Sequence, residues 1–488
     1  MSAFRGLPLP DTCAALSFAC LCVVLVDCCI TGGGHYLSIG PLTVRMLFGF
    51  AAAVLALPVI FRDLRNFLKK PVIWLFLIFV VYMGICAARG LLAGNRRSVL
   101  ISDIKGFMWL YLVPVAVAVV TSRQRLEKLL SCVIAGAVLQ AVLIIGIHTL
   151  CSVDSIWQYY LYDPFIKLQL GTISYVSEGL FRIFTNSSPY MVIGCALMLF
   201  RQVKEDKLRW RYVIGIAICL NGLLLTFTRS LYGCVFVVVV CALLALVFFF
   251  RERIWKSLGF IAVTVCAAFL LVSCQEFIFD TSYFGFAMER TLGVSVSSPG
   301  AMLRDVLDAW QDSRKPPVEE MTWEEAELEY IEQAREEEKR YWQEVCLEKT
   351  DATDSVRDTT LAELNALLVQ APFFGNGLGA SVGNREDGLD EYFYYDMIIR
   401  MGIVGLLLYL APFAYGLYLC LRQRKKLKFL PDIVGICCGM VGFWAVTWFN
   451  PWMNAALGIA WYAVYSVIPG LLKHDLSAGA DDLIKNNT

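Results

Sequence analysis

The stretch LLLTFTRSLYG, Leu223–Gly233, places one arginine inside a run of 38 residues, Val213 to Phe250, that carries no other charge. One helix of that length would measure about 57 Å, whereas the hydrocarbon core of a bilayer is about 30 Å thick. The run therefore predicts two membrane spans joined by a tight turn at residues 228–230. A cation at the centre of a membrane helix costs about 3 kcal/mol, and such residues are functional by default. Arg229 therefore needs a partner or an exit from the membrane.

The composition of the whole chain is that of a membrane protein. Of the 488 residues 58% are hydrophobic and 17% are charged, and the mean hydropathy is +0.62. A span needs about 20 apolar residues. The candidate spans are 12–30, 39–61, 72–89, 106–121, 129–151, 181–200, 211–228, 231–250, 255–273, 392–421, 431–449 and 451–472.

We therefore predict an all-α polytopic membrane protein with about twelve transmembrane helices. A large, mostly helical loop is expected between spans nine and ten. The predicted parts are spans one to nine in residues 1–273, the loop 274–391, spans ten to twelve in residues 392–472 and a tail of residues 473–488.

Along the chain, loops rich in lysine and arginine alternate with loops that contain few of them, and this pattern predicts the orientation of the chain in the membrane. The basic loops begin at residues 62, 122, 201, 251 and 422 and hold 4, 3, 5, 3 and 5 of these residues. By the positive-inside rule both termini are then cytoplasmic, while Arg229 and the loop 274–391 lie on the outer side. The net charge of zero offers no basic field for nucleic acid.

One outer segment breaks this pattern. Residues 89–105 carry Arg96 and Arg97 on the side that is otherwise poor in cations. Short loops give noisy charge counts, so chance is one explanation. The alternative is that these arginines bind an anionic substrate on the outer face.

The outer loop contains two different helical patterns. Residues 318–349 are acidic and contain no glycine or proline, so they predict a helix that is either a solvated surface or a docking site for a protein partner. A second helix begins with Arg357 and ends at Pro372. The sequence GNGLGA, residues 375–380, follows it, and its glycines would let backbone N–H groups approach a ligand.

Two arginines are the first candidates for chemistry. Arg229 either extends to the outer interface as a structural residue or lines an outer cavity that binds an anionic head group. A guanidinium suits a diphosphate because it bonds bidentately and keeps its charge. Arg357 is either simply exposed or attracts an anion together with the positive end of its own helix.

Two further segments place polar residues at outer helix ends. In FRIFTNSSPYM, residues 181–191, Arg182 opens a span and Asn186 interrupts it, as in helix ends that line a cavity. In the tenth span, Asp396 and Arg400 are spaced for an ordinary intrahelical ion pair. Glu391, at the membrane surface, is placed to act as a general base. Arg290, in the outer loop, completes the candidate substrate-binding residues.

The sequence contains no motif for metal binding or for nucleotide hydrolysis. The three histidines are far apart, the cysteines lie mostly in apolar runs, and no spacing matches a zinc site. A Walker motif is absent from the sequence, so nucleotide hydrolysis is not expected. We therefore predict no metal and no cofactor.

Together these motifs resemble the O-antigen ligase and O-antigen polymerase superfamily of bacterial envelope glycan assembly. Four features are similar. In chain order they are the Arg182 to Pro189 segment, the TFTRS turn at residues 226–230, the helix that begins at Arg357 and ends in PFFGNGLG, and a polar residue, Glu391, that opens the next span. The matching parts cover about residues 180–235 and 354–410.

This resemblance implies a metal-independent glycosyltransferase of the bacterial inner membrane with its active site facing the periplasm. Such an enzyme moves a preassembled glycan from undecaprenyl diphosphate to an acceptor. Arg229 and Arg357 would bind the donor diphosphate, and Glu391 would activate the acceptor hydroxyl. The candidate substrate-binding residues are Arg96, Arg97, Arg182, Asn186, Arg290, Gly375, Gly377, Gly379 and Arg400.

The motifs do not decide which molecule accepts the glycan. In ligases it is lipid A–core, and in polymerases it is another lipid-linked repeat unit. Ligases usually have histidine followed by asparagine where this chain has Glu391 and Tyr392. A transporter of lipid-linked glycans is an alternative of another class, although such proteins usually contain internal repeats. A non-catalytic assembly scaffold that binds partners through residues 318–349 is a third.

Overall fold

The computed structural model describes residues 9–32, 38–39, 42–177, 179–293, 363–381, 393–448 and 452–474, together with the single positions 299, 300, 302, 304 and 450. The acidic segment 318–349, Arg357, Glu391 and the tail after residue 474 lie outside the described residues. The predictions made for them are therefore untested.

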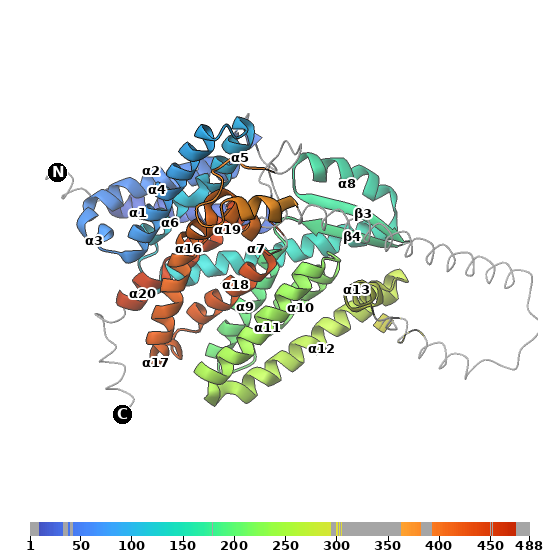
Figure 1. Ribbon diagram of the computed structural model, residues 1–488. Helices are drawn as coiled ribbons and strands as arrows, with labels where there is room; N and C mark the ends of the chain where they lie inside the picture. Colours follow the sequence, from blue (N-terminus) through green and yellow to red (C-terminus); the bar gives the residue numbers. More distant parts are fainter. Residues whose placement is uncertain are drawn as a thin grey trace, which may run out of the picture.

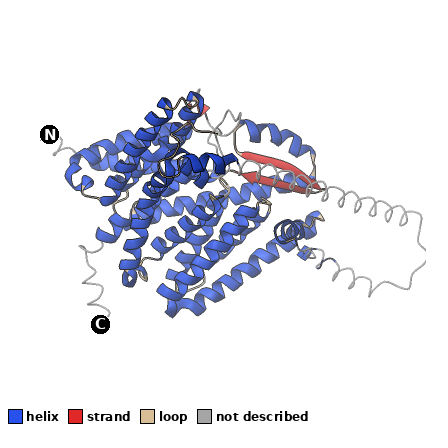
Figure 2. Cartoon of the chain, viewed as in Figure 1, coloured by secondary structure: helices blue, strands red, loops and turns tan. Residues whose placement is uncertain are grey.

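Helices dominate the fold, and most run through one bundle (Figure 1, Figure 2). The first half contains α1 (Leu9–Thr31), α2 (Val44–Arg62), α3 (Leu64–Leu68), α4 (Pro71–Leu92), α5 (Arg97–Phe107), the 3-10 turn η2 (Met108–Tyr111), α6 (Leu112–Val119), α7 (Arg123–Val153) and α8 (Ile156–Lys167). The next elements are α9 (Pro189–Lys204), α10 (Trp210–Leu224), α11 (Arg229–Phe249), η3 (Arg251–Arg253), α12 (Ile254–Phe279) and α13 (Tyr283–Leu292). The C-terminal elements are α16 (Phe393–Arg422), α17 (Arg424–Leu427), α18 (Pro431–Val446), η4 (Trp452–Asn454), α19 (Ala456–Tyr465) and α20 (Ile468–His474).

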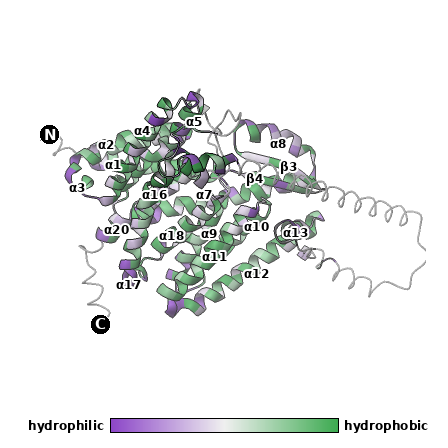
Figure 3. Ribbon diagram, viewed as in Figure 1, coloured by the Kyte–Doolittle hydropathy of each residue, from purple (hydrophilic) through white to green (hydrophobic). Residues whose placement is uncertain are grey.

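The chain is a helical, multi-pass membrane protein. In the part of the chain that the structure describes, nine helical segments are long and apolar enough to cross a bilayer, and α10 and α18 are shorter apolar helices. Hydrophobic residues cover the sides of the long helices, while hydrophilic residues gather at their ends and in the short helices α3 and α17 (Figure 3). The coarse prediction is confirmed, whereas the finer count of twelve spans stays a prediction.

Two predicted spans, 39–61 and 181–200, are wrong at their starts, because short strands precede the helices that begin at Val44 and Pro189. Residues 181–200 were expected to form one helix, but residues Leu180–Thr185 form strand β4 and the helix begins only at Pro189. The reason is visible in the burial of β4, where Phe181, Ile183 and Thr185 are buried in alternation, as in a strand. Because proline lacks an N–H, it favours the first position of α9.

Two small antiparallel hairpins accompany the helices in the described part of the chain. Strands β1 (Ser38–Ile39) and β2 (Leu42–Thr43) form one. Strands β3 (Gly171–Ser177) and β4 form the other, with Ser174 opposite Arg182. Helix α8 packs on β3, so this hairpin and α8 form a unit beside the bundle (Figure 2).

The long helix α7 organises the middle of the bundle, where it packs against α1, α9 and α10. Small residues make this packing close, as is common among membrane helices. A Cβ atom on Gly136 of α7 would lie 2.6 Å from the Cβ of Cys29 in α1, and one on Gly194 of α9 would lie 2.7 Å from the Cβ of Ala137. Cys29 thus fills space as a small hydrophobic residue, as expected for the cysteines in apolar runs.

Residues 371–381 form a glycine-rich turn that packs against α4 and α16. A Cβ atom on Gly90 of α4 would overlap the carbonyl oxygen of Leu378 in this turn. The Leu378 N–H donates to the Cys86 carbonyl over 3.0 Å, and two side chains of this region, Arg89 and Asn95, donate to carbonyls of residues 374–378. The turn is therefore fixed to α4 by its backbone.

Replacing Gly90 by alanine is expected to lower the melting temperature of the purified protein in detergent. The added methyl group would collide with the Leu378 carbonyl, and overpacking of this kind costs about 1–3 kcal/mol. Gly84→Ala is the matched control on the same helix, because nothing lies within 4 Å of its Cβ position. Equal melting temperatures for the two variants would contradict the close contact between α4 and the turn.

Candidate functional site

The stretch LLLTFTRSLYG, residues 223–233, forms the turn between α10 and α11 and the ends of both helices. Helix α10 ends at Leu224 and α11 begins at Arg229, so the turn occupies residues 225–228, slightly earlier than predicted. Two threonine hydroxyl groups donate hydrogen bonds to backbone carbonyls here. The Thr226 hydroxyl donates to the Leu223 carbonyl over 2.7 Å, and the Thr228 hydroxyl donates to the Thr226 carbonyl over 2.9 Å.

Phe227 holds this turn in a backbone conformation that is rare for a residue with a side chain. Its φ is +44°, a region that costs a non-glycine residue about 1–2 kcal/mol. The ring is buried and meets Phe286 of α13 edge to face, with 5.0 Å between ring centroids. Packing of Phe227 against α13 therefore fixes a turn that the backbone alone would not favour.

Helix α13 is held against the bundle by a buried carboxylate. Glu276, near the end of α12, is fully buried, and its Oε1 accepts from the backbone N–H of Phe284 over 2.7 Å. The Tyr283 hydroxyl donates to Asn221 of α10 over 3.0 Å. These bonds place the far end of α13, which carries Arg290, beside the α10–α11 turn.

Three arginines from three elements meet at this turn, and we call Arg182, Arg229 and Arg290 the arginine cluster. Arg229 is exposed, and its Nε donates to the backbone carbonyl of Arg290 over 2.9 Å. The Nε of Arg182, on β4, donates to the Thr226 carbonyl over 3.1 Å. The charges of Arg182 and Arg290 both act on the hydroxyl of Tyr232, one turn into α11.

The cluster concentrates positive charge at one end of two central helices. Arg229 is the first residue of α11, where the helix dipole adds positive potential. An anion with several oxygens, such as a diphosphate, matches several guanidinium groups because each can donate two parallel hydrogen bonds. This arrangement joins three residues that the sequence had placed in three separate segments.

Asn186 has a different position from the one expected. Its side-chain amide donates to the Gln169 carbonyl over 3.0 Å, and its backbone N–H donates to the Leu170 carbonyl over 3.0 Å. These bonds close the open end of the β3–β4 hairpin. Asn186 therefore holds the strand that carries Arg182.

The three glycines of the turn do not offer their N–H groups to a ligand. The N–H of Gly375 donates to the Ala371 carbonyl, that of Gly377 to the Arg400 carbonyl and that of Gly379 to a carboxylate oxygen of Asp103, over 2.7–3.0 Å. Their φ angles are +69°, +86° and +83°, which only glycine adopts at low cost. The prediction of ligand binding by this turn does not fit these bonds, because the protein itself takes up all three donors.

Arg400 is the centre of a buried charge network. Its guanidinium bonds to Asp103 of α5 and lies 2.7 Å from Asp396 in its own helix, and all three side chains are buried. Nε of Arg400 donates to the Ala380 carbonyl over 3.3 Å, and Asn454 donates to Asp396 over 3.3 Å. The expected intrahelical pair is therefore confirmed, and Asp103 joins it.

Arg96 and Arg97 lie at the beginning of α5, where both are exposed. The Arg96 carbonyl accepts the Leu100 N–H over 3.0 Å and lies 3.1 Å from the Cβ position of Gly379. The structure thus places these two arginines beside the glycine-rich turn. Their proposed contact with substrate stays a prediction.

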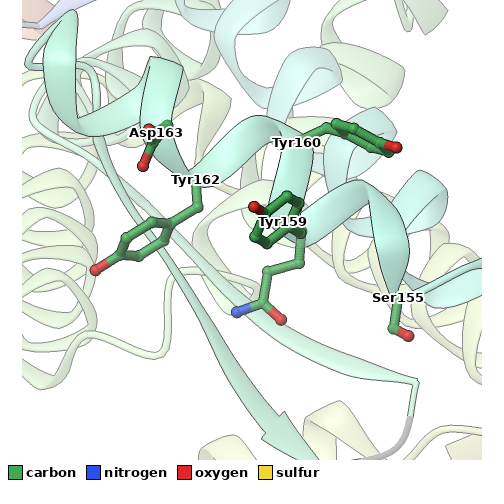
Figure 4. Close-up of a pocket in the computed structure, with 6 residues that line it drawn as sticks. Ser155, Tyr159, Tyr160, Tyr162 and Asp163 are labelled. Carbon is green, nitrogen blue, oxygen red and sulfur yellow. The ribbon is translucent and has the colours of Figure 1, made fainter.

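Sequence reasoning missed a pocket along α8. A cavity of about 520 Å³ is lined by Ser155, Gln158, Tyr159, Tyr160, Tyr162 and Asp163. Figure 4 shows these side chains along the helix, with Tyr162 and Asp163 toward one end and Ser155 toward the other. The sequence signal was present, because three tyrosines occur within residues 159–162.

The cavity along α8, which we call the tyrosine pocket, is linked to the arginine cluster through the β3–β4 hairpin. Helix α8 packs on β3, β3 pairs with β4, and β4 carries Arg182. Tyr159 is 80% exposed, so its ring is open to a large ligand. One supporting unit therefore connects an aromatic surface with a cationic one.

Neither models of protein families nor curated proteins match this sequence.

The buried network gives a direct test of the role of Arg400. Arg400→Met leaves two buried carboxylates without their cation, and breaking such a network costs about 3–5 kcal/mol. We expect a low yield of folded protein in size-exclusion chromatography and a reduced melting temperature. Adding Asp103→Asn and Asp396→Asn should restore much of the yield.

Arg422→Met, at the exposed far end of α16, is the control and should behave like the unmodified protein. If Arg400→Met folded normally and lost only activity, Arg400 would be a substrate-binding residue as the sequence had indicated.

Proposed function

We propose that this protein is a membrane glycosyltransferase that moves a preassembled glycan from undecaprenyl diphosphate to an acceptor on the outer face of the inner membrane. The observation that carries the proposal is the convergence of Arg182, Arg229 and Arg290 at one end of α10 and α11. The motif resemblance points to the same donor, because the arginine turn is one of its motifs.

In the proposed reaction the acceptor hydroxyl oxygen attacks the anomeric carbon of the first sugar. The bond from that carbon to the diphosphate oxygen breaks, and undecaprenyl diphosphate leaves with the bonding electrons. Arg229 and its neighbours stabilise the growing negative charge, which is usually the largest contribution to this kind of catalysis. The hydroxyl proton passes to a base, which we assign to Glu391, with Arg357 as a further cation at the diphosphate.

This assignment needs no metal ion or cofactor, because the arginines supply the positive charge at the leaving group. Guanidinium groups keep their charge at any physiological pH. The glycine-rich turn and Arg400 serve as a frame on the outer side of α4, α5 and α16 in this proposal, and they do not contact the donor.

The tyrosine pocket is assigned to the glycan of the donor. Sugar rings present C–H faces that pack on aromatic rings, whose faces are electron-rich, while Gln158 and Asp163 offer hydrogen bonds to hydroxyl groups. A glycan attached to a diphosphate at the arginine cluster would reach α8 along the hairpin. Transfer to lipid A–core or to another lipid-linked repeat would use the same donor site, so ligase and polymerase remain two forms of this proposal.

Replacing Arg229 by alanine in a host that depends on this protein is expected to lower transfer about 100-fold or more, the usual effect of losing one donor to a developing charge. Surface glycan would be lost and lipid-linked glycan would accumulate, as seen by gel analysis. Arg211→Ala, at the opposite end of α10 and 68% exposed, is the control and should leave transfer unchanged.

The accumulated material distinguishes the alternatives. Full-length lipid-linked chains indicate a ligase, and single lipid-linked repeats indicate a polymerase. Lipid-linked glycan confined to the inner leaflet would indicate a transporter instead. Normal surface glycan from the Arg229→Ala variant would contradict a role for the cluster at the diphosphate.

Replacing Tyr159 by alanine should weaken donor binding while the chemical step remains. We expect KM for the lipid-linked donor to rise about tenfold with little change in kcat, because the contact is equally strong before and during reaction. Tyr418→Ala, an exposed tyrosine of α16, is the control. A fall in kcat without a change in KM would refute a glycan-binding role for α8.

A further inference from the structure

A second cavity lies at the opposite, basic end of the bundle, where α4, α6 and α20 come together. Its volume is about 360 Å³, within the range of small-molecule sites. Three lysines line it, Lys69 and Lys70 just before α4 and Lys473 in α20, and we call it the lysine pocket. Its apolar wall includes Pro71, Val117 and Pro469.

In the described part of the chain, negative charge only partly balances the lysines of this pocket. Lys70 is partly buried, its Nζ donates to the neutral Val117 carbonyl over 2.9 Å, and burial lowers its pKa. Asp63 is the carboxylate that acts on Lys70, and it also accepts from the Asn66 amide over 2.7 Å. Within the described residues Lys69 and Lys473 form no ion pair, and both are exposed. Among the described residues, three lysines thus lie beside one carboxylate.

A tryptophan marks the depth of the pocket in the membrane. Trp74, in the first turn of α4, is 54% exposed, and its ring N–H donates to the Leu68 carbonyl over 2.6 Å. Exposed Ile78 and Val81 follow on the same helix, as expected for a surface in contact with lipid tails. Because tryptophan collects at the level of lipid head groups, the lysine pocket opens at that level.

We propose that the lysine pocket binds the phosphate group of an anionic phospholipid. Lys69 and Lys473 bind the phosphate oxygens, and Lys70 lies behind them as a compensating charge. Pro71, Val117 and Pro469 contact the glycerol and the first methylene groups of the lipid. The lipid thereby connects α20 to the beginning of α4, and this site is independent of the proposed transferase reaction.

The test compares lipid retention by the purified full-length protein in neutral detergent. Native mass spectrometry after incubation with phosphatidylglycerol or cardiolipin should show bound lipid, whereas phosphatidylcholine should not bind. Lys69→Ala with Lys473→Ala is expected to lower retention about tenfold or more, since each cation near an anionic lipid contributes about 1 kcal/mol. Both lysines are exposed, so this variant should keep the melting temperature of the lipid-free protein.

The control variant, Arg65→Ala with Lys428→Ala, removes the same charge from exposed positions outside the pocket and should retain lipid normally. Equal loss in both variants would overturn the site in favour of general charge attraction. A third arm adds inorganic phosphate alone. Full displacement of phosphatidylglycerol by millimolar phosphate would overturn the lipid as ligand and identify a soluble phosphate compound instead.

Discussion

A charge placed among membrane helices must be neutralised where it lies, and the packing of α5, α16 and the glycine-rich turn depends on Arg400. Its guanidinium is shared between Asp103 and Asp396, so α5 and α16 are joined by charge and by hydrogen bonds at once. The other oxygen of Asp103 accepts the Gly379 N–H, and the Arg400 carbonyl accepts the Gly377 N–H. The network around Arg400 therefore fixes α5, α16 and the glycine-rich turn of residues 371–381 to one another.

The arginine cluster differs, because Arg229 and Arg290 lie near helix ends and Arg182 lies on strand β4. The α10–α11 turn exposes Arg229 instead of burying it, and the carbonyls of Thr226 and Arg290 direct the guanidinium groups of Arg182 and Arg229. These carbonyl acceptors fix the directions of the two guanidinium groups at the turn. The two arginine sites thus differ in kind: carboxylates bind the guanidinium of Arg400 in the interior of the protein, whereas backbone carbonyls bind those of Arg182 and Arg229 at the turn.

The sequence predicted the class of the fold and the position of the central turn, because both depend on long runs of apolar residues and on one arginine between them. It did not predict strand β4, since a six-residue strand next to a helix looks like the beginning of that helix when hydropathy alone is read. The pairing of Arg400 with Asp103 was also out of reach, because those residues are 297 positions apart and no local pattern joins them. Likewise, Gly375, Gly377 and Gly379 have the composition of a ligand-binding loop, but only tertiary packing shows where their N–H groups point.

The shortness of α10 has a consequence for the surrounding lipid. Its 15 residues span about 22 Å, less than the roughly 30 Å of an ordinary hydrocarbon core. Trp210 and Ile214 of this helix are 60% and 53% exposed, so lipid tails must meet it directly. Bilayers adapt to a short apolar surface by thinning, and a thin patch beside α10 would bring the phosphates of the nearest leaflet toward Arg229. Helix length, as much as charge, thereby sets the distance between this end of the bundle and the nearest lipid head groups.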